Sequence, residues 1–122
     1  MLDHIGVPVS DIDRAKAFYQ KALAPLGYAL MREFPGVAGF GVPPKPDFWL
    51  GQGPVGQKLH VAFRAANRTM VKAFYDAAIA AGGRDNGPPG TRPMYHEHYY
   101  GAFVLDPDGH NIEAVCHDPY LG

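Results

Sequence analysis

The stretch LDHIGVPVSDIDRAKAFYQKALAPLG at residues 2–27 decides the fold, because much of its pattern returns later in the chain. Residues 58–83 read KLHVAFRAANRTMVKAFYDAAIAAGG, and the tetrad KAFY occurs in both stretches at an offset of 56 residues. At the same offset His4 aligns with His60 without a gap. Self-similarity at a fixed spacing is the signature of a repeated structural unit. The sequence therefore predicts two copies of one module.

Each copy begins with a strand-like apolar pattern, at about residues 3–9 and 59–64. Apolar residues then recur at the spacing of an amphipathic helix. In the first copy Ser10 followed by Asp13 resembles a capping box, and in the second copy Asn67 is the expected N-cap. Both copies are therefore expected to run from a strand directly into a capped helix.

Three short strand candidates follow each helix, which Gly27 and Gly82–Gly83 are expected to end in a left-handed conformation. These candidates lie at about residues 28–33, 38–42 and 48–51 in the first copy, and at 84–86, 100–105 and 111–116 in the second. The predicted order is a strand, a helix and three strands, twice, in an α+β fold. We expect one domain over residues 1–122, with module 1 at about 1–56 and module 2 at about 57–122.

The composition limits the classes of function. The 122 residues are 47% hydrophobic with a net charge of −1, which suits one compact core and offers no basic stripe for nucleic acid. No apolar run approaches the length that spans a bilayer, and the N-terminus shows no charged leader before an apolar segment. The single cysteine, Cys116, agrees with a reducing compartment. We therefore expect a cytoplasmic protein that binds a small molecule and neither a membrane nor nucleic acid.

Residues 103–115, FVLDPDGHNIEAV, contain a turn and then a short apolar strand with one carboxylate, Glu113. Alternation along the strand puts Ile112 and Ala114 on one face and Glu113 on the other. By the same alternation Cys116 lies opposite Glu113 and is expected to pack. A glutamate that faces a protein interior is costly unless a partner compensates its charge. Glu113 is therefore expected to have a partner.

A long loop, NGPPGTRPMYHEHYY at residues 86–100, precedes that strand pair, and loops of this length tend to be functional. Its imidazole and phenol groups suit proton transfer and aromatic contacts. The candidates for catalysis are His96, His98 and Tyr100 of this loop, together with Glu113. The candidates for substrate binding in the loop are Tyr95 and Arg92, and Arg92 would hold an anionic group. The alternative is an exposed aromatic loop or a dimer contact. His110 and His117 are expected to be turn and strand-end residues.

The order of elements, with a histidine on the first strand of each copy and Ile112–Glu113 on the last, resembles the vicinal oxygen chelate superfamily. This superfamily includes glyoxalases, bleomycin-resistance proteins and extradiol dioxygenases. The resemblance runs from LDHIGVPVSD to LDPDGHNIE and covers almost the whole chain. It implies that the modules form an open, cup-shaped mixed sheet that holds one divalent metal ion per site. By position, the implied metal ligands are His4, His60 and Glu113.

The chemistry of this ligand set agrees with the resemblance. Two imidazoles and one carboxylate leave positions open on a divalent ion, so that a substrate can be chelated through two oxygens. Zinc, manganese, iron(II), nickel and cobalt all accept such a set, and the sequence does not choose among them. The alternative is structural, with His4 and His60 as satisfied core histidines and Glu113 as the cap of a neighbouring loop.

Three positions depart from particular members of the superfamily. Trp49 stands where glyoxalase I has a glutamate ligand, Gly6 where fosfomycin-resistance enzymes have a threonine, and Phe103 where extradiol dioxygenases have a tyrosine. His96 is a candidate for the upstream histidine of the extradiol signature. Trp49 and Phe103 are candidate substrate-binding residues. If Trp49 faces the cup, it forms an apolar wall that favours a flat substrate; the alternative is that it packs against a helix.

The resemblance implies a metal-dependent enzyme of the lyase or isomerase type, which acts through a metal-chelated enolate or oxyanion. Ring cleavage of the extradiol type and metal-free binding of a small molecule, such as an antibiotic, are the alternatives. Open sheet edges and an apolar cup need covering, which predicts a two-fold symmetric homodimer. The site then lies either within one chain or between subunits.

Overall fold

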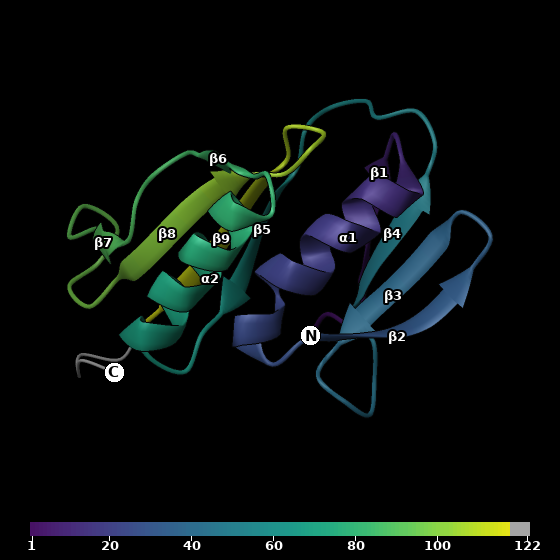
Figure 1. Ribbon diagram of the computed structural model, residues 1–122. Coiled ribbons are helices and arrows are strands. Elements are labelled where there is room, and N and C mark those ends of the chain that lie inside the picture. The colour runs from purple at the N-terminus through teal and green to yellow at the C-terminus, as the bar shows by residue number, and fades with distance from the viewer. Residues whose placement is uncertain (118–122) are drawn as a thin grey trace.

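The structure is a computed structural model that describes residues 1–117 (Figure 1). It contains two modules with the predicted order of elements, so the α+β fold class is confirmed. The first module consists of β1 (Ile5–Val9), α1 (Ile12–Ala22), the 3₁₀ helix η1 (Ala24–Leu26), β2 (Ala29–Phe34), β3 (Val37–Gly41) and β4 (Phe48–Gln52). The second consists of β5 (His60–Arg64), α2 (Arg68–Ala80), β6 (Arg84–Asp85), β7 (Gly90–Thr91), β8 (Tyr100–Leu105) and β9 (Asn111–Cys116).

Each module forms its own open mixed sheet. The strand order is β1-β4-β3-β2 in the first sheet and β5-β9-β8-β6 in the second, where β7 also pairs with β8. In both sheets the first and last strands of the module are parallel neighbours, β1 beside β4 and β5 beside β9. β1 and β5 are therefore edge strands, and over residues 1–117 the two sheets share no ladder of hydrogen bonds.

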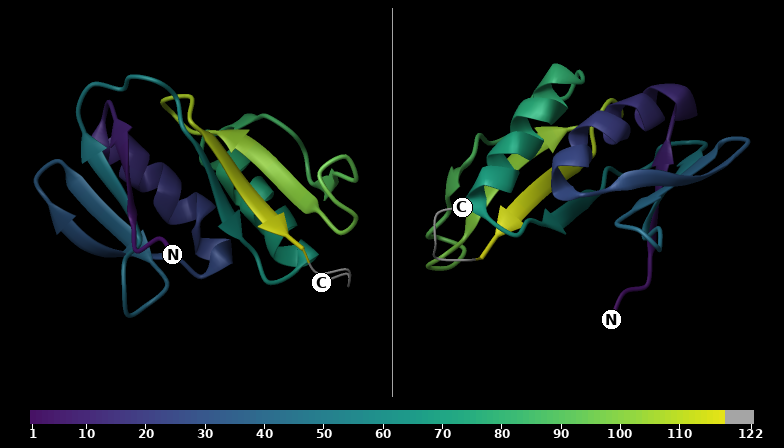
Figure 2. Two further views of the ribbon diagram at one scale, coloured as in Figure 1. Left: turned by 180° about the vertical axis from the view of Figure 1, so that it is seen from behind. Right: turned by 60° about the horizontal axis from the view of Figure 1, so that its bottom comes forward.

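Both helices lie on the same side of the two sheets (Figure 1), and the view from behind shows the strands without helices in front of them (Figure 2). We call this second side the helix-free face. Phe48 and Leu50 of β4, and Ile112 and Ala114 of β9, are buried in the hydrophobic core that the helices share. Residues between them on the same strands point to the helix-free face, because strand side chains alternate. No helix within residues 1–117 is long and apolar enough to cross a membrane.

The helix ends agree with the sequence in the second module and differ in the first. Asn67 caps α2 as predicted, because its side chain accepts a hydrogen bond from the Met70 backbone N–H at 2.9 Å. The N-cap of α1 is Asp11, which accepts from the Arg14 N–H, so the predicted capping box at Ser10 is wrong. The Ser10 hydroxyl instead donates a hydrogen bond to Asp108, in the turn before β9.

The glycines after the helices also act differently from one another. Gly27 is left-handed, with φ of 86°, but it caps η1, because α1 already ends at Ala22. Gly82 is left-handed, with φ of 102°, whereas Gly83 is not. A β-carbon at Gly83 would lie 2.9 Å from the Ala78 carbonyl oxygen. Glycine is therefore required here because a side chain would not fit, and not because of its backbone angle.

Strand boundaries agree with the predicted ranges to within one or two residues, and the last two strands coincide with them. Two differences bear on the site. β1 begins at Ile5, so His4 precedes the strand instead of lying on it. The long loop contains the short strand β7, which pairs with β8 and ties the loop to the second sheet.

The repeated tyrosines have different environments, although both come from the tetrad KAFY. Tyr19 is 0% exposed, and its hydroxyl donates a hydrogen bond of 2.5 Å to Asp106 Oδ2. Tyr75 donates at 2.9 Å to Asp85 near the surface. Asp106 belongs to the turn between β8 and β9, so the buried bond of Tyr19 joins the first module to the second.

The turn at residues 106–110 has further contacts that fix its position. The second oxygen of Asp106 accepts from the backbone N–H groups of Asp108 and His110, each at 2.9 Å. The Asp108 carboxylate accepts from the hydroxyl and the backbone N–H of Ser10. The buried His110 ring accepts from the Leu59 N–H at 2.9 Å and donates to the Pro8 carbonyl at 2.8 Å. His110 is thus a turn residue, as predicted, that links both modules.

We predict that Tyr19→Phe lowers the free energy of unfolding by about 1–3 kcal/mol, because Asp106 then keeps a buried oxygen without its donor. Urea denaturation measures the change, with Tyr75→Phe as the repeat-related control, for which a much smaller loss is expected. Burial, and then the Asp106 carboxylate, raises the pKa of the Tyr19 hydroxyl well above its ordinary value. The stabilisation is therefore present below about pH 10 and lost above it. Equal losses in the two variants would contradict this role of Tyr19.

Candidate functional site

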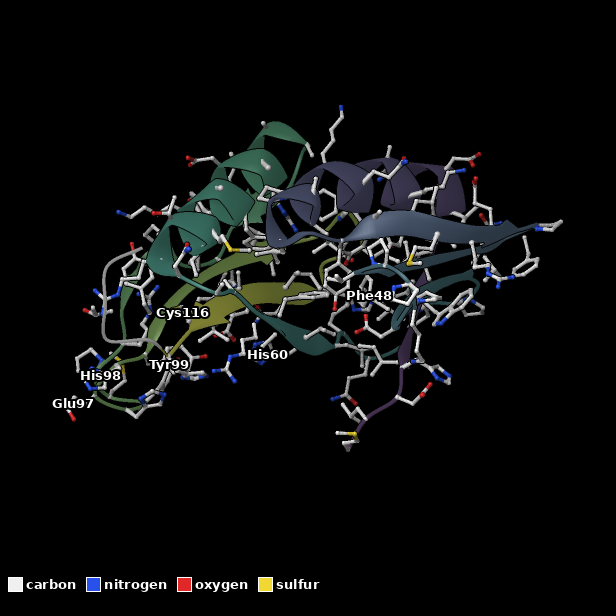
Figure 3. All side chains as sticks on the ribbon, turned by 90° about the horizontal axis from the view of Figure 1, so that it is seen from below. Phe48, His60, Glu97, His98, Tyr99 and Cys116 are labelled. Carbon is white, nitrogen blue, oxygen red and sulfur yellow. The ribbon has the colours of Figure 1, made fainter. Side chains whose placement is uncertain are left out.

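The Glu113 carboxylate is buried on the helix-free face and has two partners. Its side chain is 1% exposed. His60 Nε2 donates to Glu113 Oε1 at 2.8 Å, and the Tyr99 hydroxyl donates to Oε2. Figure 3, viewed from below, shows His60 and Tyr99 on the side of the sheet away from the helices. Within one chain the charge of Glu113 is therefore compensated by two residues from separate segments.

The strand register explains how these side chains meet. Glu113 of β9 lies opposite Ala62 of β5 and opposite Phe103 of β8. Phe103 is nearly buried, and its ring centroid lies 6.2 Å from that of His60. Because residues two apart on a strand share a face, His60 and Ala62 both point to the side where Glu113 lies.

Gly101 makes the contact between Tyr99 and Glu113 possible. A β-carbon at this position would lie 3.1 Å from the Tyr99 ring and 3.3 Å from Glu113 Oε2. Contacts this short require the neighbours to move. Burial, and then the hydrogen bond to Glu113, raises the pKa of the Tyr99 hydroxyl, while the Arg92 charge lowers it. The hydroxyl therefore remains protonated near neutral pH and acts as a donor.

Trp49 occupies the position in module 1 that Glu113 occupies in module 2. Trp49 lies opposite Gly6, and Glu113 lies opposite Ala62, which is 56 residues after Gly6. The half-buried Trp49 side chain lies between two core residues of β4 and so points to the helix-free face. Its ring covers Gly39, where a β-carbon would approach it to 2.7 Å. The orientation of Trp49 therefore agrees with the alternative in which it faces away from the helices, and not with the one in which it packs against a helix.

His4 lies apart from the other two implied metal ligands. It is exposed, and its Nδ1 is 2.7 Å from Asp3 Oδ1. Over residues 1–117 no three side chains of histidine, cysteine, aspartate or glutamate are arranged to hold a metal ion. One chain therefore brings together His60 and Glu113 but not His4.

The pair formed by His60 and Glu113 fits two neighbouring positions on a divalent metal. Bonds of about 2.0–2.2 Å from nitrogen and oxygen ligands separate adjacent donor atoms by about 3 Å. The observed separation between His60 Nε2 and Glu113 Oε1 is 2.8 Å. The two residues could therefore bind a metal with little movement once His60 Nε2 has lost the proton that it donates to Glu113. A complete site needs a further ligand.

The loop before β8 contributes an aromatic and imidazole cluster beside Glu113. His96 Nε2 lies 2.6 Å from His117 Nδ1, and the two rings are stacked. The Tyr99 ring lies 5.3 Å from the His96 ring and 4.9 Å from the Tyr95 ring between centroids. His117 is a site neighbour that the sequence analysis assigned only to a strand end. The register of β8 and β9 could have placed it beside Tyr99, because Tyr100 pairs with Cys116.

Two of the predicted catalytic residues lie elsewhere. Tyr100 is on the helix side of the sheet, where the Arg68 guanidinium lies 4.8 Å from its ring centroid. Its neighbour Tyr99 makes the contact with Glu113 instead. His98 lies 3.8 Å from the exposed Glu97 carboxylate, and its backbone N–H donates to His96. Cys116 is buried, in agreement with a packing role.

We predict that Glu113→Gln lowers the pKa of Tyr99 toward its ordinary value of about 10, because the carboxylate no longer disfavours the phenolate. The pKa should stay above that value, since the hydroxyl remains partly buried. NMR titration of ring-labelled tyrosine, assigned with Tyr99→Phe, measures it. Glu97→Gln changes an exposed carboxylate of the same loop and should leave the titration unaltered. An unchanged Tyr99 pKa in Glu113→Gln would show that the hydrogen bond is absent in solution.

Comparison with known proteins identifies the family. Residues 1–114 match the Glyoxalase/Bleomycin resistance protein/Dioxygenase superfamily, and the comparison with curated proteins finds no match. The chain is similar to a glyoxalase/bleomycin resistance protein from Albidiferax ferrireducens T118, at 28% identity and a TM-score of 0.82, over 95% of this chain and 98% of that chain. It shares the fold of a lactoylglutathione lyase from Agrobacterium tumefaciens, at 19% identity and a TM-score of 0.71, over 95% and 92% of the two chains. The protein belongs to the Glyoxalase/Bleomycin resistance protein/Dioxygenase superfamily.

Proposed function

We propose that the protein is a metal-dependent cytoplasmic enzyme that acts on a small oxygenated molecule by lyase or isomerase chemistry. Its ligands for one divalent ion per site would be His4, His60 and Glu113. The observation that carries the proposal is the Glu113 carboxylate, which is 1% exposed and lies 2.8 Å from an imidazole nitrogen. Membership of the superfamily supports it. A buried carboxylate paired with histidine suits a metal site better than a surface contact.

In this proposal His4 comes from a second copy of the chain. His4 precedes the edge strand β1 and is exposed, and His60 begins the edge strand β5 with a side chain that is 53% exposed. Two accessible imidazoles at unpaired sheet edges suit a site formed where two copies meet. A two-fold axis would then create two identical sites in a homodimer.

The residues around Glu113 suggest how the site would handle protons. The Tyr99 hydroxyl, whose pKa is raised first by burial, has a single donor proton. It would exchange its hydrogen bond to Glu113 for one to a substrate oxygen and would stay protonated. The His96 ring contacts Tyr99 and is linked to His117, so it could accept a proton from the substrate and return it. A bound divalent metal would polarise a substrate oxygen and stabilise the negative charge that forms there.

A metal-free small-molecule binding protein is the second candidate function, and one observation favours it. Both oxygens of Glu113 already have partners within one chain, so its charge is compensated without a metal. Ring cleavage of the extradiol type has less support, because Phe103 provides no hydroxyl at the position of the tyrosine. Tyr99 offers the nearest hydroxyl on the same face.

We predict that protein purified without a histidine tag binds about one equivalent of a divalent metal per chain, measured by elemental analysis after reconstitution. His60→Ala and Glu113→Ala should weaken the affinity more than about 100-fold, because even outer-shell partners of metal ligands change it by about 10–100-fold. His98→Ala serves as the control and should bind normally. Less than about half an equivalent, without recovery on reconstitution, would favour the binding protein.

Mixed dimers test whether the site is shared between subunits. His4→Ala and His60→Ala chains should each bind metal poorly as homodimers. A heterodimer of the two, purified through different tags that are then removed, should recover about one ion per dimer, because one of its two sites is intact. A site within one chain would be damaged in both subunits and would recover nothing.

We predict that Trp49→Glu raises the affinity for divalent metal, because the register gives this residue the place of Glu113 in the other module. A carboxylate there would supply a further oxygen ligand. Gln52→Glu adds the same charge at the exposed end of the same strand and should have no effect. Isothermal titration with zinc and manganese measures both variants. Unchanged affinity in folded Trp49→Glu would mean that Trp49 does not face the metal.

A further inference from the structure

A pocket lies beside the Glu113–His60 pair. It has a volume of about 250 Å³ and is lined by Asn86, Gly87, Arg92, Tyr95, Phe103 and Asn111; we call it the Arg92 pocket. Phe103 is the register partner of Glu113, and Asn111 is the register partner of His60. The pocket therefore continues the candidate site along the same strands.

Among residues 1–117, Arg92 is the only charged residue that lines this pocket. Its guanidinium donates to the backbone carbonyls of Thr91 and Pro88, and it lies 5.5 Å from the centroid of the Phe103 ring. Over residues 1–117 no carboxylate lies within ion-pair distance of it. A guanidinium has five donors, and two carbonyls leave part of that set available to a ligand. The charge is thus positioned by the protein but not neutralised.

Two glycines shape the cradle of the guanidinium. A β-carbon at Gly90 would lie 3.1 Å from Arg92 Nη1, and one at Gly87 would lie 3.3 Å from Nη2. Gly87 also has a φ of 145°, in the region that favours glycine. A β-carbon at either position would require its neighbour to shift by a few tenths of an ångström. Together with the two hydrogen bonds to backbone carbonyls, this close fit orients the guanidinium before an anion binds.

The remaining lining favours a flat organic ligand. Tyr95 offers an exposed aromatic ring, and the nearly buried Phe103 ring forms part of the wall. The other polar residues, Asn86 and Asn111, are uncharged. The single positive charge of Arg92 compensates one negative charge. Its planar guanidinium can donate two parallel hydrogen bonds to the two oxygens of a carboxylate. An inorganic phosphate dianion would leave half of its charge without compensation.

We propose that the Arg92 pocket binds the carboxylate of a flat, aromatic substrate whose other oxygen-bearing end reaches Glu113 and His60. The inference rests on the proposed function for the chemistry at Glu113, and it adds a substrate class and a specificity-determining residue. Arg92 here orients the substrate and takes no part in proton transfer.

Benzoate is the probe, with benzamide as its neutral counterpart and inorganic phosphate as the competing anion. Binding is measured by NMR titration of the full chain in the presence of EDTA, so that no metal is needed. Benzoate should bind at least about tenfold more tightly than either of the other two. Arg92→Met should reduce benzoate affinity about tenfold or more, and Arg92→Lys should reduce it less, because the charge remains without the fork.

Two further variants separate this pocket from general charge and from the metal site. Gly90→Ala keeps the charge but displaces the guanidinium, and it should weaken benzoate binding, whereas the exposed Arg14→Gln should not. Because EDTA removes any metal from this assay, benzoate should bind whether or not the protein binds a metal ion. Failure of metal binding with benzoate binding intact would overturn the proposed function alone. Undetectable benzoate binding at millimolar concentration, or equal loss in Arg14→Gln and Arg92→Met, would overturn the pocket.

Discussion

The buried hydrogen bond between Tyr19 and Asp106 is the contact on which the relative position of the modules depends. Asp106 accepts from the helix of module 1 with one oxygen and from its own turn with the other. His110, at the end of the same turn, contacts backbone groups of both modules. Because β9 begins directly after this turn, the contacts also fix where Glu113 stands along the second sheet.

The repeat supplies one scaffold twice, and each copy uses it differently. Trp49 and Glu113 occupy equivalent register positions, yet one is an apolar ring over Gly39 and the other is a buried carboxylate. Tyr19 and Tyr75 differ in the same way, since only Tyr19 is buried. At the register position of Trp49 and Glu113 the first module thus has an apolar ring, and the second has a buried carboxylate.

The cost of burying Glu113 explains much of the structure around it. A carboxylate removed from water needs hydrogen bonds to both oxygens, and His60 and Tyr99 provide them. Gly101 leaves the space that Tyr99 needs, and β7 ties the preceding loop to β8. The same loop contributes His96, which contacts Tyr99, and Arg92, which lines the adjoining pocket. The buried charge of Glu113 therefore orients His60 and Tyr99.

The sequence by itself determined the two modules, the order of their elements and the need of Glu113 for a partner, because periodicity and internal repetition are local properties. It did not determine that Tyr99, and not Tyr100, reaches Glu113. Adjacent strand residues point to opposite faces, and the sequence of the preceding loop does not show which of the two tyrosines faces Glu113. Nor could it separate His4 from His60, which are equivalent in the repeat but lie at the edges of two separate sheets. Contacts between residues far apart in the chain are decided only by how the modules pack. The distance between two side chains in space does not follow from the number of residues between them in the sequence.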